Sequence, residues 1–188
     1  MARRLLPPLL VSVVALLGFA GQPARAAKPV VVAVDGTLCD LTRTMAADQA
    51  SVVCLIPPGG DPHGYRLKPS DRQAISQAAL VLHVGFGLTP AVSKLRSPGT
   101  IVAVGEVALP NYKGSDPHVW HDPANSAAMV RVIRQSMSSV LPSSERALLD
   151  ARAVRAAAVF NALKSWGAKQ IASIPASQRV FITDHKTY

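Results

Sequence analysis

The sequence predicts an α/β fold with three parts: an N-terminal lobe whose mainly parallel sheet is flanked by helices, a long connecting helix, and only the start of a second α/β lobe. Short apolar, β-branched runs alternate with helical patterns over residues 30–140. This alternation is typical of right-handed crossovers between parallel strands. An alanine-rich helical pattern then covers residues 143–173 and predicts the connecting helix.

Four continuous apolar runs predict strands that are buried on both faces, at residues 30–34, 52–56, 80–84 and 100–104. Helical spacing predicts helices at residues 38–47, 70–79, 89–95, 124–140 and 143–173. Ser70 follows Pro69 and is the expected cap of the 70–79 helix. Because parallel sheets bind ligands at the carboxyl ends of their strands, we expect a site in the loops that follow the strands.

The 143–173 helix is long for a domain of this size, and Gly167 is the point at which an interruption is expected. Six apolar residues recur in it at helical spacing and predict one packed face: Leu148, Leu149, Ala153, Ala156, Phe160 and Leu163. After Pro175, residues 179–183 read RVFIT and predict a strand that enters a new sheet. The chain stops five residues later, so we expect a truncated form of a longer protein.

Residues 1–26 are predicted to be a secretory signal peptide, which places the mature chain in the periplasm or outside the cell. Arg3 and Arg4 provide the positive start, residues 9–20 form an uncharged apolar stretch, and residues 24–26 (Ala-Arg-Ala) have the small-x-small cleavage pattern. A short membrane anchor is the alternative, but the apolar stretch is shorter than the roughly 18 residues that span a bilayer. No cysteine lies at the cleavage point, so we expect no lipid anchor.

The composition excludes several classes of protein. Hydrophobic residues make up 49% of the 188 residues and charged residues 16%, which excludes a disordered protein. The net charge is +9, but the basic residues are scattered along the sequence without interleaved aromatic residues, so no nucleic-acid partner is expected. Two cysteines are too few for a four-cysteine zinc site. In an oxidising compartment Cys39 and Cys54 are predicted to pair, with two buried thiols as the alternative, and either role is structural.

Three of the five histidines lie where an α/β fold gathers a ligand. His63 follows the second strand, His118 lies in a loop before a helix, and His185 follows the last strand. His63 and His118 each end an Asp-Pro-His triplet, in which proline restricts the backbone and holds the side chain ready for its ligand. Neutral imidazole is the commonest metal ligand at physiological pH. Solvated or hydrogen-bonded histidines are the alternative, and the sequence has no His-x-x-x-His signature.

The other two histidines have different expected roles. His121 lies three residues after His118 and is a candidate for an additional ligand to the same metal. His83 lies inside an apolar strand and is expected to be a core or pocket residue. We therefore predict a site made by His63, His118 and His185.

The signal peptide and four further segments resemble the zinc- and manganese-binding solute-binding proteins of bacterial ABC transporters, the ZnuA/TroA-like family. The segments read PPGGDPHGYRLKPSD (57–71), ALVLHVGFGL (79–88), SDPHVWHDPAN (115–125) and FITDH (181–185). They occur in the order of the family and at roughly its spacing. The resemblance implies two α/β lobes joined by one long rigid helix, with a metal ion bound between the lobes.

On this resemblance, the N-terminal metal-binding lobe covers residues 27–141, the linker helix 142–174, and the first strand of a truncated C-terminal lobe 175–188. His63, His118 and His185 match the first three ligands of the family, the third of which is Glu in many manganese-selective members. Three imidazole nitrogens favour zinc, with manganese as the second choice. The fourth ligand of the family, an acidic residue late in the second lobe, has no counterpart in this sequence.

The resemblance implies a periplasmic high-affinity zinc receptor, not an enzyme, that delivers the metal to the membrane permease of an ABC importer. A secreted zinc hydrolase is an alternative, because three histidines and one water form a known catalytic arrangement. That activity would need a general base, and no Glu accompanies the histidines, so Asp184, next to His185, is the candidate. A non-functional truncated remnant is the third alternative.

Overall fold

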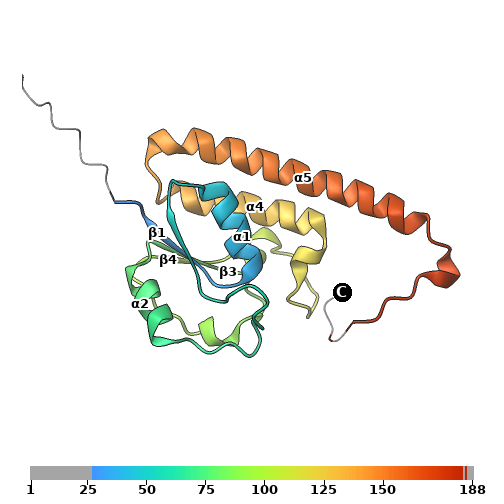
Figure 1. Cartoon of the computed structure of the whole chain (residues 1–188), viewed down its shortest axis with the longest axis horizontal. Coiled ribbons are helices and arrows are strands. Elements are labelled where there is room, and N and C mark those ends of the chain that lie inside the picture. The colour runs from blue at the N-terminus through green and yellow to red at the C-terminus, as the bar shows by residue number, and fades with distance from the viewer. Residues whose placement is uncertain (1–26, 184, 186–188) are drawn as a thin grey trace, which may run out of the picture.

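The computed structural model describes residues 27–183 and 185, and shows an α/β lobe followed by one long helix (Figure 1). The four strands of the lobe are β1 (Val30–Ala33), β2 (Ser51–Cys54), β3 (Leu80–His83) and β4 (Thr100–Ala103). Their order in the sheet is β2-β1-β3-β4, and every neighbouring pair is parallel. The predicted fold class is confirmed, while the predicted signal peptide lies outside the described residues.

Each strand ends one or two residues before its predicted end. Parallel hydrogen bonding nevertheless continues past the ends of β1 and β2. Val34 N–H donates to Leu82 O (2.9 Å), and Ile56 N–H donates to Val34 O (3.0 Å). The apolar runs therefore include one or two residues beyond the strand ends whose backbone still pairs with the sheet, a usual uncertainty in the position of an element's end.

Helices cover both faces of the sheet. One face packs against α1 (Gly36–Ala46), α4 (Pro123–Ser138) and α5 (Arg146–Ala172), and the other against α2 (Pro69–Gln77) and the short helix η1 (Pro90–Val92). Successive side chains of a strand point to opposite faces. Val31 and Ala33 of β1 accordingly join the first core, and Val32 and Val34 join the second.

A side-chain cap sets the start of α1. The helix begins at Gly36, two residues before its predicted start, because the Asp35 carboxylate accepts a hydrogen bond from Leu38 N–H (3.0 Å). Burial raises the pKa of Asp35 to about 6. The first turn of α1 is thus fixed directly at the carboxyl end of β1.

The prediction of Ser70 as the cap of α2 is wrong. The helix begins at Pro69, and Lys68 occupies the cap position. The Asp71 carboxylate reaches back to accept a hydrogen bond from Lys68 N–H (2.7 Å), so an acidic side chain inside the first turn stabilises the start of the helix.

Two short segments differ from their predicted structure. The helix predicted over residues 89–95 is reduced to the single turn of η1. A short helix, α3 (Val104–Ala108), follows β4 directly, where the prediction placed the end of a strand. A Cβ atom on Gly105 would lie 2.7 Å from Val84 O, so the backbone of α3 packs directly on the segment that follows β3. The remaining short helices are η2 (Val119–His121), η3 (Ser143–Glu145) and η4 (Ala176–Gln178).

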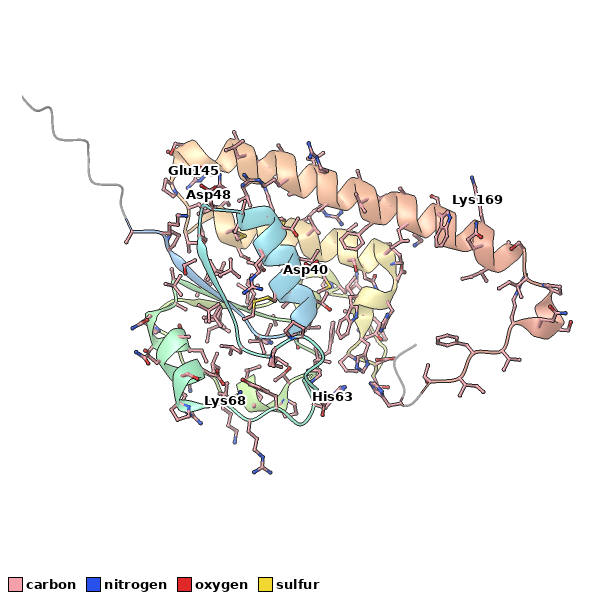
Figure 2. All side chains as sticks on the ribbon, in the orientation of Figure 1. Asp40, Asp48, His63, Lys68, Glu145 and Lys169 are labelled. Atoms are coloured by element: carbon pink, nitrogen blue, oxygen red, sulfur yellow. A yellow bond between two sulfur atoms is a disulfide. The ribbon has the colours of Figure 1, made fainter. Side chains whose placement is uncertain are left out.

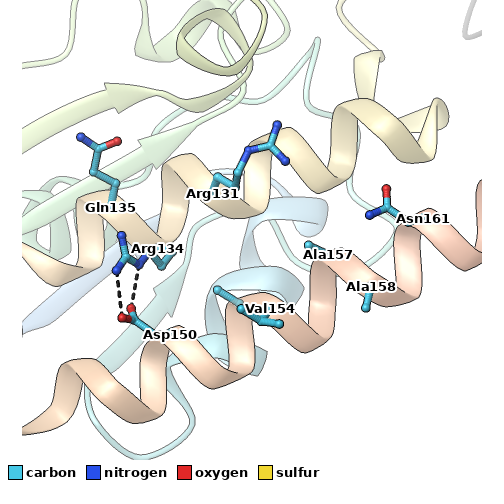
Figure 3. A pocket seen from close by; sticks show the side chains of 9 residues that line it. Arg131, Arg134, Gln135, Asp150, Val154, Ala157, Ala158 and Asn161 are labelled. Carbon is cyan, nitrogen blue, oxygen red and sulfur yellow. Dashed lines mark hydrogen bonds and ion pairs between the residues drawn. The ribbon is translucent and has the colours of Figure 1, made fainter.

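The long helix α5 packs against α4 and then extends beyond it (Figure 1). Arg134 of α4 and Asp150 of α5 form an ion pair with two hydrogen bonds, 2.7 and 2.9 Å long, beside a surface hollow of about 720 Å³ (Figure 3). Gly167 does not interrupt the helix, contrary to expectation. None of the helices in residues 27–183 combines the length and apolar character that a membrane span needs.

The predicted packed face of α5 is correct only in part. Leu149 and Ala153 are buried, and Ala156 and Phe160 pack partly against the core, but Leu148 is 54% exposed and Leu163 is 44% exposed. Leu148 is one residue from Leu149 and is rotated about 100° from it around the helix, so it faces away from the core. Leu163 lies where α5 passes the first turn of α4, beyond which little covers the helix.

The strand predicted at residues 179–183 is absent. This segment has no strand assignment, and its three apolar side chains Val180, Phe181 and Ile182 are exposed. A strand exists only when a neighbouring strand accepts and donates its backbone hydrogen bonds. The described residues provide no such neighbour, and the segment instead folds back toward the lobe (Figure 1).

A disulfide bond joins Cys39 of α1 to Cys54, the last residue of β2. The alternative of two buried thiols is not what the structure shows. The bond fastens the helix to the strand three residues before Pro57, where the loop that carries His63 begins.

Replacing both cysteines by serine is expected to lower the free energy of unfolding by about 3 kcal/mol, because the bond closes a loop of 15 residues in the unfolded chain. Urea unfolding of the wild type and of the Cys39→Ser/Cys54→Ser variant measures this difference. Wild type treated with a reductant is the control, and it should match the variant. A variant as stable as the oxidised wild type would contradict the expectation.

Candidate metal site

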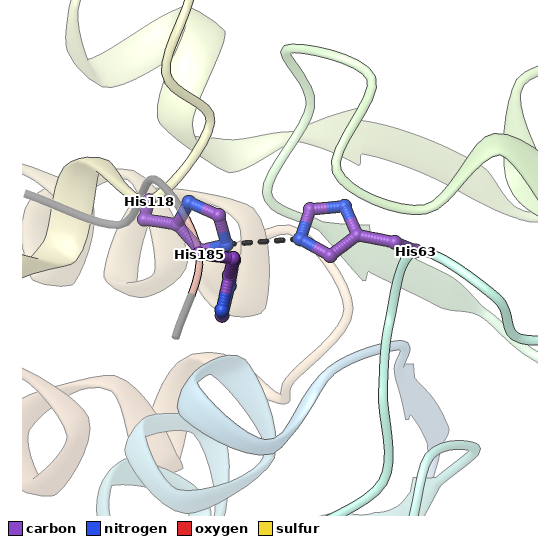
Figure 4. A group of neighbouring side chains, drawn as sticks. All are labelled: His63, His118 and His185. Carbon is purple, nitrogen blue, oxygen red and sulfur yellow. Dashed lines mark hydrogen bonds between the residues drawn. The ribbon is translucent and has the colours of Figure 1, made fainter. Parts of the chain in front are cut away.

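Three histidines from distant parts of the sequence meet at the carboxyl edge of the sheet. His63 lies in the loop between β2 and α2, His118 lies immediately before η2, and His185 lies in the segment after α5. Each offers one ligand atom, and these atoms all lie within 4.8 Å of one another (Figure 4). The structure therefore brings together the three histidines that the sequence singled out.

The spacing of the nitrogens suits a small metal ion. The Nε2 atoms of His63 and His118 are 3.0 Å apart. Two zinc–nitrogen bonds of the usual length, at a tetrahedral angle, place their nitrogens about 3.3 Å apart. The pair is thus close to the geometry it needs, and the centroid of the His185 ring lies 5.2 Å from that of His118 and 5.9 Å from that of His63.

Both Asp-Pro-His triplets form the same local turn. The Asp61 carboxylate accepts a hydrogen bond from His63 N–H (2.9 Å), and the Asp116 carboxylate accepts one from His118 N–H (3.0 Å). The first of these bonds holds the pKa of Asp61 below its usual range. Aspartate in this position fixes the backbone two residues ahead, so each triplet aims its histidine through the main chain.

Asp116 has a second role that Asp61 lacks. Its Oδ1 lies 2.7 Å from Nδ1 of His118, whose side chain is buried. A carboxylate at this distance favours the tautomer with the proton on Nδ1, which leaves the lone pair of Nε2 free for a metal. From the sequence, Asp61 and Asp116 are expected to orient or cap their loops, but the contact with the imidazole ring depends on where the ring turns and not on the spacing of residues.

The histidines line an open cavity of about 690 Å³. Trp120 forms one wall, with its ring centroid 5.2 Å from that of His118. His63 and His185 are exposed, whereas His118 is only 8% exposed. Sequence reasoning gave Trp120 no role, although its place two residues after His118 was the available signal. The site is therefore anchored on one buried ring and is accessible from the side of the other two.

His121 and His83 lie apart from the three histidines. His121 lines the same cavity, but it does not belong to the group of three, and its ring centroid is 6.4 Å from that of His118. Burial lowers the pKa of His121, and the neighbouring His118 lowers it further. His83 ends β3 partly buried, and this burial lowers its pKa. In the part of the chain that the structure describes, no fourth His, Cys, Asp or Glu joins the group.

The fold and the histidine cluster together define an α/β protein with a candidate metal site at the carboxyl edge of a parallel sheet. The chain belongs to the ZnuA family, described as zinc-uptake complex component A periplasmic, whose model matches residues 31–188. The resemblance drawn from the sequence motifs is thereby confirmed.

The relatives of the chain include proteins named for different metals. The zinc-binding protein TroA of Treponema pallidum is 29% identical over 171 residues, which are 86% of this chain and 55% of TroA. The manganese-binding lipoprotein MntA of Halalkalibacterium halodurans is 32% identical over 158 residues, which are 80% of this chain and 52% of MntA. The solved structure of the periplasmic zinc-binding protein TroA has a TM-score of 0.77 at 27% identity, over 82% of this chain and 59% of that chain. The chain thus spans about half the length of these relatives.

Removing the Asp116 carboxylate is expected to weaken zinc binding more than removing the Asp61 carboxylate. Loss of a group that orients a metal-binding histidine costs about 10- to 100-fold in affinity. Competitive zinc titration of Asp116→Ala and Asp61→Ala measures the contrast, since Asp61 contacts only the backbone N–H groups of His63 and Gly64 in the described residues. Equal losses in the two variants would mean that the turns matter and the imidazole contact does not.

Proposed function

We propose that this chain is a periplasmic receptor that binds zinc and delivers it to the membrane permease of an ABC importer. The observation that carries the proposal is the convergence of three imidazoles from three separate segments on one point, within 4.8 Å of one another. Membership of the zinc-uptake family and the similarity to TroA support it. Export through the signal peptide predicted at residues 1–26 would place the chain in the periplasm.

The donor set favours zinc over manganese. Imidazole nitrogen suits borderline ions such as zinc, whereas manganese prefers carboxylate, carbonyl and water oxygens. Manganese is the second candidate, because the manganese-binding lipoprotein MntA is a relative of this chain. A transport receptor must bind its metal tightly and then release it, so affinity and release are the properties to measure.

The division of the chain follows from this function. We propose that residues 27–141 form the metal-binding lobe, that residues 142–174 form the helix that connects two lobes, and that residues 175–188 begin the second lobe. His63 and His118 would then belong to the first lobe and His185 to the second. A metal bound to all three would hold the lobes together, and its release would require them to separate.

A competitive zinc titration of the exported, processed chain tests the proposal. We expect sub-micromolar affinity with one zinc per chain, and affinity for manganese at least about 100-fold weaker. Zinc binding that is micromolar or weaker, or that has no defined stoichiometry, would overturn the receptor. Tighter binding of manganese than of zinc would support a metal receptor but would identify manganese as its metal.

A further inference from the structure

Five basic side chains gather on the layer that α2 and η1 form over one face of the sheet. Arg66 and Lys68 precede α2, Arg72 lies in its first turn, and Lys94 and Arg96 lie between η1 and β4. All five are exposed. We call these five residues the basic patch.

The basic patch has almost no acidic counterpart. Between residues 62 and 105 the only acidic residue is Asp71. Asp71 is buried, and its carboxylate already accepts hydrogen bonds from the Tyr65 hydroxyl and from Lys68 N–H, both 2.7 Å long. Among the described residues, none of the five basic side chains has an ion pair or a side-chain hydrogen bond. The five side chains therefore present their charge to solvent without an ion-pair partner in the described residues.

Three residues of the basic patch line a hollow. A cavity of about 410 Å³ is lined by Arg72, Lys94 and Arg96 together with apolar side chains that include Leu67 and Leu95. A cationic rim over a partly apolar floor suits a ligand that has an anionic head and an apolar body. An anionic phospholipid has this structure, with a phosphate group directly above the glycerol and acyl region.

The exposure of the cations favours a surface with many anions over one small anion. An exposed cation is screened by salt and holds a single ion weakly. On an anionic membrane the contributions of separate basic side chains add, because each finds its own headgroup. An acidic protein surface could also supply many carboxylates, but it gives no reason for the apolar floor.

We propose that the basic patch docks this lobe on an anionic phospholipid surface. His63 and Lys68 lie in the same loop, and Figure 2 shows both at the edge of the lobe that is remote from α5. Docking through the patch would bring the histidine cavity close to the membrane that carries the permease. The biological purpose of the contact rests on the proposed function, whereas the contact itself does not.

Vesicle co-sedimentation tests the proposal. The exported, processed chain is mixed with vesicles of equimolar phosphatidylcholine and phosphatidylglycerol, and separately with vesicles of phosphatidylcholine alone. We expect binding to the anionic vesicles only, weakened by added salt. The variant Arg72→Gln/Lys94→Gln/Arg96→Gln should lose roughly a hundredfold in partitioning.

A control variant of equal charge separates the patch from net charge. Arg43→Gln/Arg155→Gln/Lys169→Gln removes three exposed cations from α1 and α5, on the opposite face of the sheet. It should keep most of the binding to anionic vesicles. Equal loss of binding in both variants would contradict the proposal that the basic patch, and not net charge, makes the contact. Binding to immobilised polyglutamate but not to anionic vesicles would indicate that the partner of the patch is an acidic protein, and would contradict the proposed phospholipid surface. Zinc titration of both variants should match the wild type, so failure of the membrane contact and failure of the metal receptor are distinguishable.

Discussion

Replacement of His118 by alanine is expected to lower zinc affinity by more than about 100-fold. Loss of a group that merely orients a ligand costs about 10- to 100-fold, and loss of the ligand itself costs at least as much. His118 is the buried member of the three histidines, and its ring is fixed by Asp116 (Nδ1 to Oδ1, 2.7 Å). The competitive zinc titration that tests the proposed function measures the change. His63→Ala should have a comparable effect.

The other two histidines of the chain provide matched controls. His121→Ala removes an imidazole that lines the same cavity, and His83→Ala removes one outside it. Both should retain zinc affinity within about threefold, because neither belongs to the group of three. If His121→Ala matched His118→Ala, the ligand set would have to be revised. If His118→Ala bound zinc like the wild type, the site would not lie where the structure places the histidines.

His185→Ala asks a separate question, because His185 reaches the site from the segment that follows α5. Two imidazoles from the lobe alone would bind zinc weakly, since a stable zinc site needs three or four protein ligands. A large loss in His185→Ala would show that this segment closes the site. A small loss would show that the lobe binds zinc without this segment, with His63 and His118 as the main ligands.

The histidines of the candidate metal site were predictable where hydrogen bonds to the main chain fix the direction of their side chains. Two Asp-Pro-His triplets in loops singled out His63 and His118, because the carboxyl ends of parallel strands share one edge. The spacing alone left solvated histidines as an alternative, and the family resemblance assigned both residues as ligands. His121 shows the limit of such reasoning, since three residues of separation did not bring its ring into the group. The Asp116 contact depends on the rotation of one side chain, and spacing in the sequence carries no information on that rotation.

The fold was predictable where buried segments appear in the sequence as runs of apolar residues. The four strands appeared as continuous apolar runs, and they form the sheet. Burial on both faces, predicted for all four, holds only for the central strands β1 and β3, because β2 and β4 are the edges of the sheet and are partly exposed. The segment at 179–183 has the same apolar, β-branched character, yet it lies outside any strand in the described part of the chain. A strand depends on its neighbour as much as on its own residues, so the pattern predicts the capacity to pair and not the pairing.

Leu149→Ala is expected to lower the free energy of unfolding by about 2–5 kcal/mol, the second large effect that the structure predicts. The Leu149 side chain has no exposed surface and belongs to the core that α5 shares with α4 and α1. Truncation removes buried methyl groups and leaves a cavity that its neighbours fill only in part. Urea unfolding, with an unchanged dependence on denaturant, measures the difference.

Leu148→Ala is the matched control, since it makes the same chemical change one residue earlier in the same helix. Leu148 is 54% exposed, so its truncation should cost less than about 1 kcal/mol. A clear difference between the two variants would show that α5 docks on the lobe through the face that bears Leu149. Equal small effects would mean that the helix is held loosely. In that case His185, which follows α5 through residues 173–183, could not be positioned by the helix, and zinc would have to order the segment on binding.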